Sequence, residues 1–277
     1  MEEGGEEVGP MRRLLVALSR AYAFITIRGY KVWASYRTQV ALNVVNWVIP
    51  LFIYYFMGVA FHLLKYTPDY LGFITVGIAF QGYFSSAITT LAGRIRNEEL
   101  IGTLEYYIAA PLSPLSLMAY SSLWGLAINA VPTALTLAVG AALGVRFAVD
   151  PLSAAAVLAL YIASSLGLNL IAGAVVLIVK QGNPVALFAS VASNLLGGTV
   201  FPVSALPPWL RYVSYALPLT WGLDGLRAAM LSAAPIPAIA QYIAPLAALA
   251  AAYLGVGVAL TRYAYYKIMR EGTVAMY

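Results

Sequence analysis

Two residue types that often carry covalent and metal chemistry, cysteine and histidine, are almost absent from this sequence. The chain of 277 residues has no cysteine and one histidine, His62. A thiol nucleophile, a cysteine-ligated metal and a multi-histidine metal site are therefore excluded. No GxxxxGK[ST] motif is present, so the chain cannot hold ATP phosphates through a Walker loop. We expect neither a catalytic site nor a metal site, and we interpret His62 as an interfacial polar residue.

One acidic stretch separates two long apolar segments. Residues 98–110 read EELIGTLEYYIAA and carry three of the eleven acidic residues of the chain. Asn97 could cap a helix that starts here, and Pro111 would end it. A short amphipathic helix with acids on one side could dock a cytosolic partner. The spacing alone is equally compatible with a solvated connector that binds nothing.

The elements that position these residues are set by an apolar composition. Hydrophobic residues make up 62% of the chain and charged residues only 10%, whereas soluble domains carry roughly 25% charged residues. A helix of about 20 residues crosses the ~30 Å hydrocarbon core of a bilayer. The charge-free segments therefore predict an all-α membrane protein with six transmembrane helices, at about 39–61, 70–92, 116–143, 152–179, 184–201 and 238–264.

The chain ends differ from this core. Residues 1–10 are acidic and lack periodicity, which predicts a disordered tail. Residues 11–36 could be mistaken for a signal peptide, but Arg20 interrupts their apolar run too early. We interpret them as a basic amphipathic helix at the membrane surface. The six-helix domain then spans 37–266, and 267–277 form a cytoplasmic tail.

Basic residues predict the orientation. If the N-terminus is cytoplasmic, four of the sixteen lysines and arginines lie outside, namely Lys65, Arg146, Arg211 and Arg227, and the other twelve lie inside. This bias follows the positive-inside rule and places both termini in the cytoplasm. It also accounts for the net charge of +5 without nucleic acid, which we do not expect as a partner.

The apolar segment 201–231 is too interrupted for a seventh span. Arg211, Asp224 and Pro218 divide it, so we expect two short helices, at about 208–216 and 219–231, in or on the outer leaflet. Pro208 suits a first helical position. Asp224 and Arg227 have the i,i+3 spacing of a local ion pair, an interpretation we favour over a substrate contact.

Two motifs resemble those of a known family. The run Glu99-Leu-Ile-Gly102-Thr103-Leu104-Glu105, followed by Ala110-Pro111-Leu112-Ser113, resembles the GTLE…TP element of type-2 ABC transporter permeases. In that family the element is a coupling helix that contacts the ATPase. The resemblance implies that the residues coupled to the ATPase are Glu98, Glu99, Gly102, Thr103 and Glu105.

The second motif lies in 201–227, where FPVS, LPPWL, LPL and DGLR occur in order. This pattern resembles the segment before the family's last helix, and both motifs together extend the resemblance over about residues 11–270. The resemblance implies an extracellular re-entrant segment that contains Pro202, Pro207, Pro208, Trp209, Pro218, Asp224 and Arg227.

The resemblance also implies a function. The chain would be the permease of an ABC exporter of the daunorubicin, lipid or polysaccharide type, in a prokaryotic cell membrane. It would need no cofactor itself, because ATP and Mg²⁺ would bind to a separate cytosolic ATPase. Its other partners would be membrane lipid and a second copy of itself or a related permease. The expected cargo is amphipathic: a drug-like compound, a lipid or a lipid-linked glycan.

Polar residues within the spans are the candidates for a transport path. They are Asn43, Asn46, Gln81, Ser85, Ser86, Asn129, Asn169 and Asn194. Each could instead form hydrogen bonds between helices, worth about 0.6 kcal/mol on average. The resemblance places helices one, two and five around the cavity, which favours Asn43, Asn46, Gln81, Phe84 and Asn194.

A second class of function is compatible with the same residues. A membrane scaffold or sensor that does not transport could dock a soluble partner through residues 98–110. No charged residue lies near the middle of a predicted helix, which argues against a transporter driven by protons or sodium.

Overall fold

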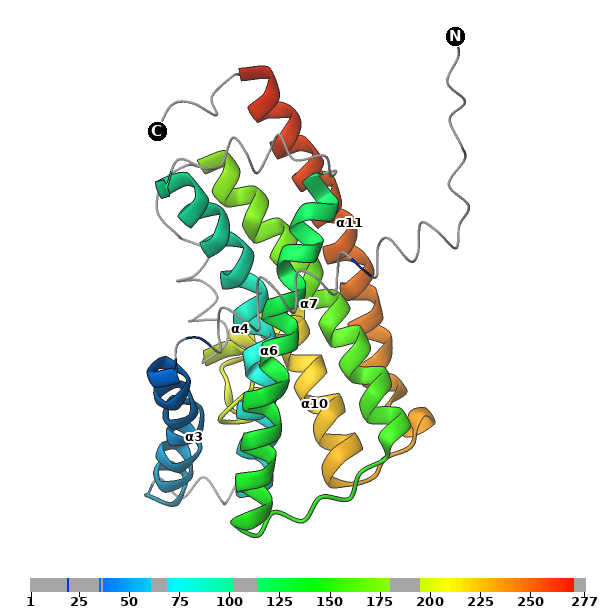
Figure 1. The fold of residues 1–277 in the computed structure, drawn as a ribbon. Helices are drawn as coiled ribbons and strands as arrows, with labels where there is room; N and C mark the ends of the chain where they lie inside the picture. The colour runs from blue at the N-terminus through cyan, green and yellow to red at the C-terminus, as the bar shows by residue number, and fades with distance from the viewer. Residues whose placement is uncertain are drawn as a thin grey trace.

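A computed structural model describes Ser19, Ser35 and residues 37–60, 69–101, 114–179 and 195–271. The secondary structure of this part of the chain is entirely helical (Figure 1). Its α-helices are α3 (Arg37–Ala60), α4 (Tyr70–Ile101), α6 (Pro114–Ala142), α7 (Pro151–Val179), α9 (Pro208–Ala216), α10 (Pro218–Leu231) and α11 (Ala240–Glu271). Two short 3-10 helices, Val203–Ala205 and Ile236–Ile239, precede α9 and α11.

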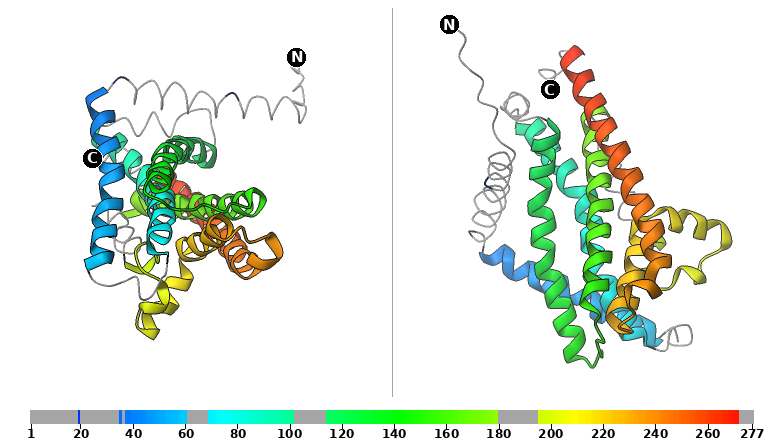
Figure 2. Two further views of the ribbon diagram at one scale, coloured as in Figure 1. Left: turned by 90° about the horizontal axis from the view of Figure 1, so that it is seen from below. Right: turned by 90° about the vertical axis from the view of Figure 1, so that its right-hand side faces the viewer.

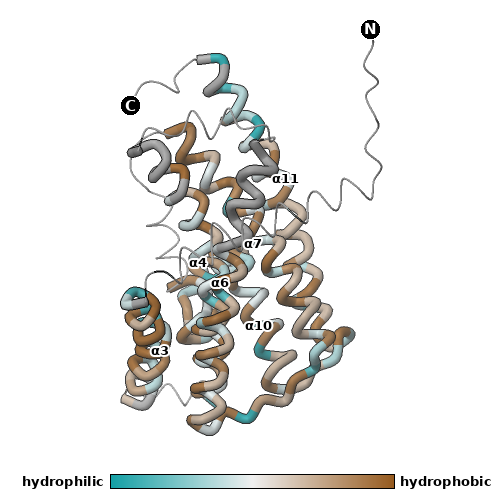
Figure 3. Tube along the Cα trace, viewed as in Figure 1, coloured by the Kyte–Doolittle hydropathy of each residue, from teal (hydrophilic) through white to brown (hydrophobic). Residues whose placement is uncertain are grey.

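Five helical segments are long and apolar enough to cross a membrane. They are Thr38–Gly58, Tyr70–Gly93, Gly125–Ala142, Pro151–Val179 and Ile236–Lys267. They coincide with five of the six spans expected from the charge-free segments, which confirms an all-α membrane protein. Figure 3 shows mostly apolar residues along these helices and polar residues toward the upper end of α11 and at the α6–α7 turn.

The remaining predicted span, 184–201, falls mostly outside the described residues. Its predicted end is wrong, because the chain is irregular from residue 197 to residue 202. Gly198 has a φ of +69°, a left-handed conformation that glycine adopts without a steric penalty and that a regular helix does not contain. The two consecutive glycines at 197 and 198 could have indicated from the sequence that the predicted span ends before them.

A separate helix starting at Asn97 was also a wrong prediction, because Asn97 lies inside α4. Residues 93–101 contain no proline, and an interior asparagine costs a helix less than about 1 kcal/mol. Continuing α4 is therefore cheaper than ending and restarting it. The same reasoning explains why α11 runs to Glu271 rather than to residue 264.

The centre of the bundle is a close contact between α7 and α11, which lie side by side in Figures 1 and 2. A Cβ on Gly167 would lie 2.4 Å from the carbonyl carbon of Tyr253, and one on Gly257 would lie 2.7 Å from the carbonyl oxygen of Gly167. Only residues without a side chain allow the two backbones to approach this closely. On the other side of α7, the Tyr161 hydroxyl donates to the Phe80 carbonyl of α4 over 3.2 Å.

The predicted pair of short helices is confirmed. α9 covers 208–216, with Pro208 as its first residue, and α10 covers 218–231. Pro218 begins the second helix, and Leu217 is the residue between the pair. α9 projects from the side of the bundle (Figure 2, right) and exposes Trp209 and Tyr212 by 67% and 78%. Exposed aromatic side chains of this kind suit the membrane–water interface.

Candidate transport site

The site begins with a polar seam between α4 and α6. Asn129 of α6 donates through Nδ2 to the Ser86 hydroxyl of α4 over 2.6 Å, and Thr133 donates to the Ala79 carbonyl over 2.7 Å. A Cβ on Gly82 would lie 2.5 Å from the Asn129 Oδ1. The small residue and the hydrogen bonds together hold α6 against α4 within the apolar bundle.

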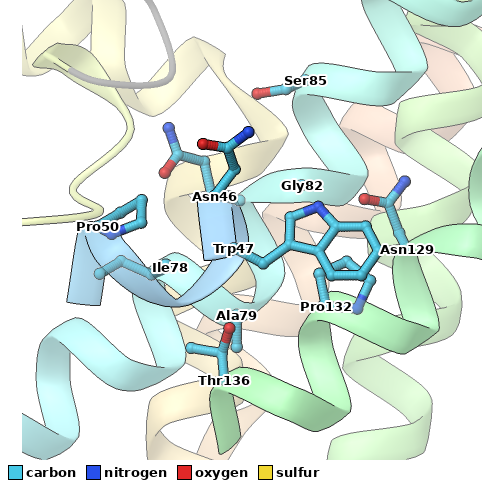
Figure 4. Close-up of a pocket in the computed structure, with 11 residues that line it drawn as sticks. Asn46, Trp47, Pro50, Ile78, Ala79, Gly82, Ser85, Asn129, Pro132 and Thr136 are labelled. Atoms are coloured by element: carbon cyan, nitrogen blue, oxygen red, sulfur yellow. The ribbon is translucent and has the colours of Figure 1, made fainter. Parts of the chain in front are cut away.

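Beside these hydrogen bonds, residues of α3, α4 and α6 line a partly open cavity of about 210 Å³. Figure 4 shows the Trp47 ring of α3 extending toward Asn129 and Pro132 of α6. Its polar lining consists of Asn46, Gln81, Ser85, Asn129 and Thr136, and its apolar lining of Trp47, Pro50, Ile78, Ala79, Gly82 and Pro132. Amide and hydroxyl groups without a formal charge can both donate and accept hydrogen bonds, so the cavity suits neutral polar groups.

Two prolines add to the polarity of the cavity. Pro50 lies inside α3 and Pro132 inside α6, and both line the cavity. A proline has no N–H, so each leaves the carbonyl four residues earlier, at Asn46 and Ile128, without its helical donor. Such freed carbonyls are expected in a membrane only beside a polar partner or a cavity. Both prolines lie in charge-free segments of the sequence. A proline inside a predicted span could therefore have indicated the cavity before the structure was known.

Only some of the residues expected to line the transport path lie at this cavity. Asn46 and Gln81 line the cavity. Asn43 lies one turn away on α3, where its Oδ1 accepts from Gln39 Nε2 over 3.3 Å. Phe84 is 0% exposed in the main hydrophobic core and does not line the cavity. Asn194 lies outside the described residues. Ser85 and Asn129, noted only as polar, join the lining, and Thr136 was missed.

Two of the predicted coupling residues lie at the opposite end of α4 from its start at Tyr70. Glu98 and Glu99 belong to the last turns of this helix. Gly102, Thr103 and Glu105 lie outside the described residues.

Arg227 is the most connected side chain of the short helices. It is 8% exposed and donates through Nη1 to Asp224 Oδ1 over 3.1 Å. Its Nε donates to the Phe73 carbonyl of α4 over 3.3 Å, and its Nη2 donates to the carbonyls of Gly198 and Thr199 over 2.8 and 3.2 Å. Its guanidinium carbon lies 3.4 Å from the centre of the Phe73 ring.

The expected Asp224–Arg227 ion pair is therefore present, but it is one part of a larger contact that joins α10, α4 and residues 198–199. Burial lowers the pKa of Arg227 to about 10, which leaves the side chain charged at neutral pH. Burial raises the pKa of Asp224, and the Arg227 charge opposes that shift.

Gly77 of α4 makes this contact possible. A Cβ there would lie 2.2 Å from the Thr199 carbonyl oxygen and 2.9 Å from Arg227 Nη2. These approaches are too close for any side chain, so the segment at 198–199 can reach α4 only because residue 77 is glycine.

Long apolar helices around a polar, uncharged cavity define a membrane protein of the transport class. Residues 22–231 match the model of the ABC-2 type transporter family. The chain belongs to this family and is a permease, the membrane subunit of an ABC transporter. Permeases of this family are generally not catalytic themselves. A search of curated proteins found no match for the chain.

Proposed function

We propose that this permease exports an amphipathic cargo from the cytoplasm, with energy from a separate ATPase. The observation that carries the proposal is the polar cavity between α3, α4 and α6 in a bundle of membrane-length helices. Uncharged polar groups are expensive to place in hydrocarbon. Here five of them line one space, together with a proline inside α3 and another inside α6.

The size of the cavity limits what it holds. Sites for drug-sized molecules usually enclose about 300–1,000 Å³, and this cavity encloses about 210 Å³. It suits the polar head of an amphipath while the apolar part remains in the lipid or against a second permease. α3 presents an apolar surface for such a neighbour, because Leu42, Val45, Ile53 and Phe56 are all more than half exposed. The proposed second permease is a copy of this chain or a related one.

α4 provides a physical link between the ATPase and the cavity. Its 32 residues run unbroken from Tyr70 to Ile101, which corresponds to about 48 Å at 1.5 Å per residue. Gln81 of the cavity and Phe73, which contacts Arg227, lie on the same helix as Glu98 and Glu99. A push on residues 98–110 by an ATPase that binds ATP and Mg²⁺ would thus reach the cavity through one rigid element.

The proposal is tested with the permease and its ATPase in proteoliposomes. A panel of amphipathic compounds should stimulate ATP hydrolysis, and Gln81→Leu, which removes a polar group from the cavity lining, should reduce that stimulation. Leu254→Ile, a change on α11 away from the cavity lining, is the control and should leave it unchanged.

Two results would count against the proposal. Equal stimulation of Gln81→Leu would remove the cavity from the path. Retention of a soluble partner that hydrolyses no nucleotide would favour the scaffold or sensor function instead.

A further inference from the structure

A second cavity, of about 500 Å³, lies at the opposite end of the molecule from the end of α4. It is formed where α4 begins, where α10 ends and where α11 begins, and its lining includes Asp69, Phe73, Asp224, Arg227, Leu231 and Tyr242. The same end holds the α6–α7 turn, because Asp150 N donates to the Ala229 carbonyl over 2.9 Å and Ala233 N donates to the Ala148 carbonyl over 2.8 Å. This is the end assigned to the outside by the basic residues.

The charges of the lining do not cancel. The Arg227 guanidinium already donates to Asp224 and to the carbonyls of Phe73, Gly198 and Thr199. It has little capacity left for an anion, and its charge is matched by Asp224. The Asp69 carboxylate adds a second negative charge, and within the described part of the chain it accepts from the backbone N–H of Gly72 over 3.0 Å. The described lining residues therefore carry a net charge of about −1.

The remaining described lining is mostly aromatic and apolar, with Ser232 as its one uncharged aliphatic hydroxyl residue. Tyr242 is the aromatic lining residue of α11, and Ala228 and Leu231 are apolar lining residues of α10. A ring face attracts an organic cation within about 6 Å of its centre. A metal ion fits less well, because no group of three or more potential metal-ligating side chains occurs in the described part of the chain.

We propose that this outer cavity binds an organic ammonium ion that carries an apolar group, with Asp69 as the main charged contact and Tyr242 as the aromatic contact. The ammonium ion could belong to a free amphipathic compound or to a lipid head group. This proposal does not depend on the proposed export function. Binding of the ammonium ion is measured without an ATPase and without transport.

The test uses phenyltrimethylammonium as the probe and the full chain in a maltoside detergent, which contains no ammonium group. Binding of the probe should be saturable in calorimetric titration. Benzenesulfonate, which has the same phenyl ring but a negative charge, should not bind. Asp69→Asn should weaken binding by about tenfold or more, since a charge pair near a protein surface is worth on the order of that factor. Tyr242→Leu should weaken it by about threefold through loss of the ring.

Asp150→Asn is the matched control. Asp150 lies at the same end and accepts from Ser153 N over 3.3 Å at the start of α7, as Asp69 does for α4, but it does not line the cavity. Asparagine caps helices about as well as aspartate, so both variants should fold, which thermal unfolding verifies. Added phosphatidylethanolamine distinguishes the two sources of the ammonium ion. If the lipid competes with the probe, the cavity binds a lipid head group; if the lipid does not compete, the cavity binds a free compound.

Several outcomes would overturn the proposal. They are no saturable binding by the wild type, equal binding of benzenesulfonate, or equal weakening by Asp69→Asn and Asp150→Asn. Binding of calcium that depends on Asp69, without binding of the ammonium probe, would replace the organic cation by a metal ion.

Discussion

Replacing Arg227 by methionine should destabilise the protein strongly, because it removes the donors that join α10 to α4 and to residues 198–199. The change removes the counterion of Asp224 and the guanidinium donors to the carbonyls of Phe73, Gly198 and Thr199. Breaking a buried ion pair by removal of one partner costs about 3–5 kcal/mol. Since the Asp224 side chain is 39% exposed, we expect the lower end of that range.

The assay is thermal unfolding of the detergent-solubilised permease. A loss of about 3 kcal/mol in a protein of this size lowers Tm by roughly 6–12 °C. Arg211→Met is the matched control, because Arg211 also donates to two carbonyls, those of Leu206 and Ser204, but only within its own segment and partly exposed to solvent. Its Tm should fall by no more than about 4 °C, for a loss of roughly 1 kcal/mol. Equal shifts for both variants would refute the structural role of Arg227.

Two further predictions concern packing and topology. Gly77→Ala should destabilise the protein by about 1–3 kcal/mol, because the added Cβ would clash with the Thr199 carbonyl. The control Gly93→Ala adds a Cβ that meets nothing within 4 Å, so it should be neutral or stabilise α4 by up to about 1 kcal/mol. Thermal unfolding distinguishes the two variants, and an unchanged stability of Gly77→Ala would contradict the close approach of α4 to Thr199. Because the natural chain has no cysteine, single cysteines at Ser204 and Ala233 should react with an impermeant thiol reagent added outside, and cysteines at Ser113 and Gln181 should not; labelling at 181 from outside would contradict the orientation.

The membrane helices could be predicted because their signal is local. A run of about 20 residues without charge identifies a span wherever its neighbours lie, and a proline at a first helical position located α9 correctly at Pro208. Helix ends were less predictable. Nothing in residues 93–101 stops a helix, so α4 continues through Asn97, although asparagine there resembles a cap.

The contacts of the site could not be predicted in the same way. Arg227 and Asp224 are three residues apart, and their pairing follows from helical spacing. The Phe73 carbonyl that Arg227 also contacts is 154 residues away, and only the packing of α10 on α4 brings the two together. The cavity also depends on tertiary packing. Asn46 and Gln81 were expected on a path, but Thr136 joins them only because α6 packs beside α4.

The central claim, that this permease is driven by an ATPase docked at residues 98–110, is tested most directly by one transport measurement. The permease and its ATPase are reconstituted together, and ATP-dependent movement of an amphipathic compound is compared between wild type and the double variant Glu105→Lys, Gly102→Leu. Glu105→Lys places like charges across the proposed interface, which costs several kcal/mol, and Gly102→Leu adds bulk where close approach is proposed. We expect a folded, membrane-inserted variant that neither retains the ATPase in pull-downs nor transports. Normal ATPase retention together with normal ATP-dependent transport by the double variant would contradict the claim.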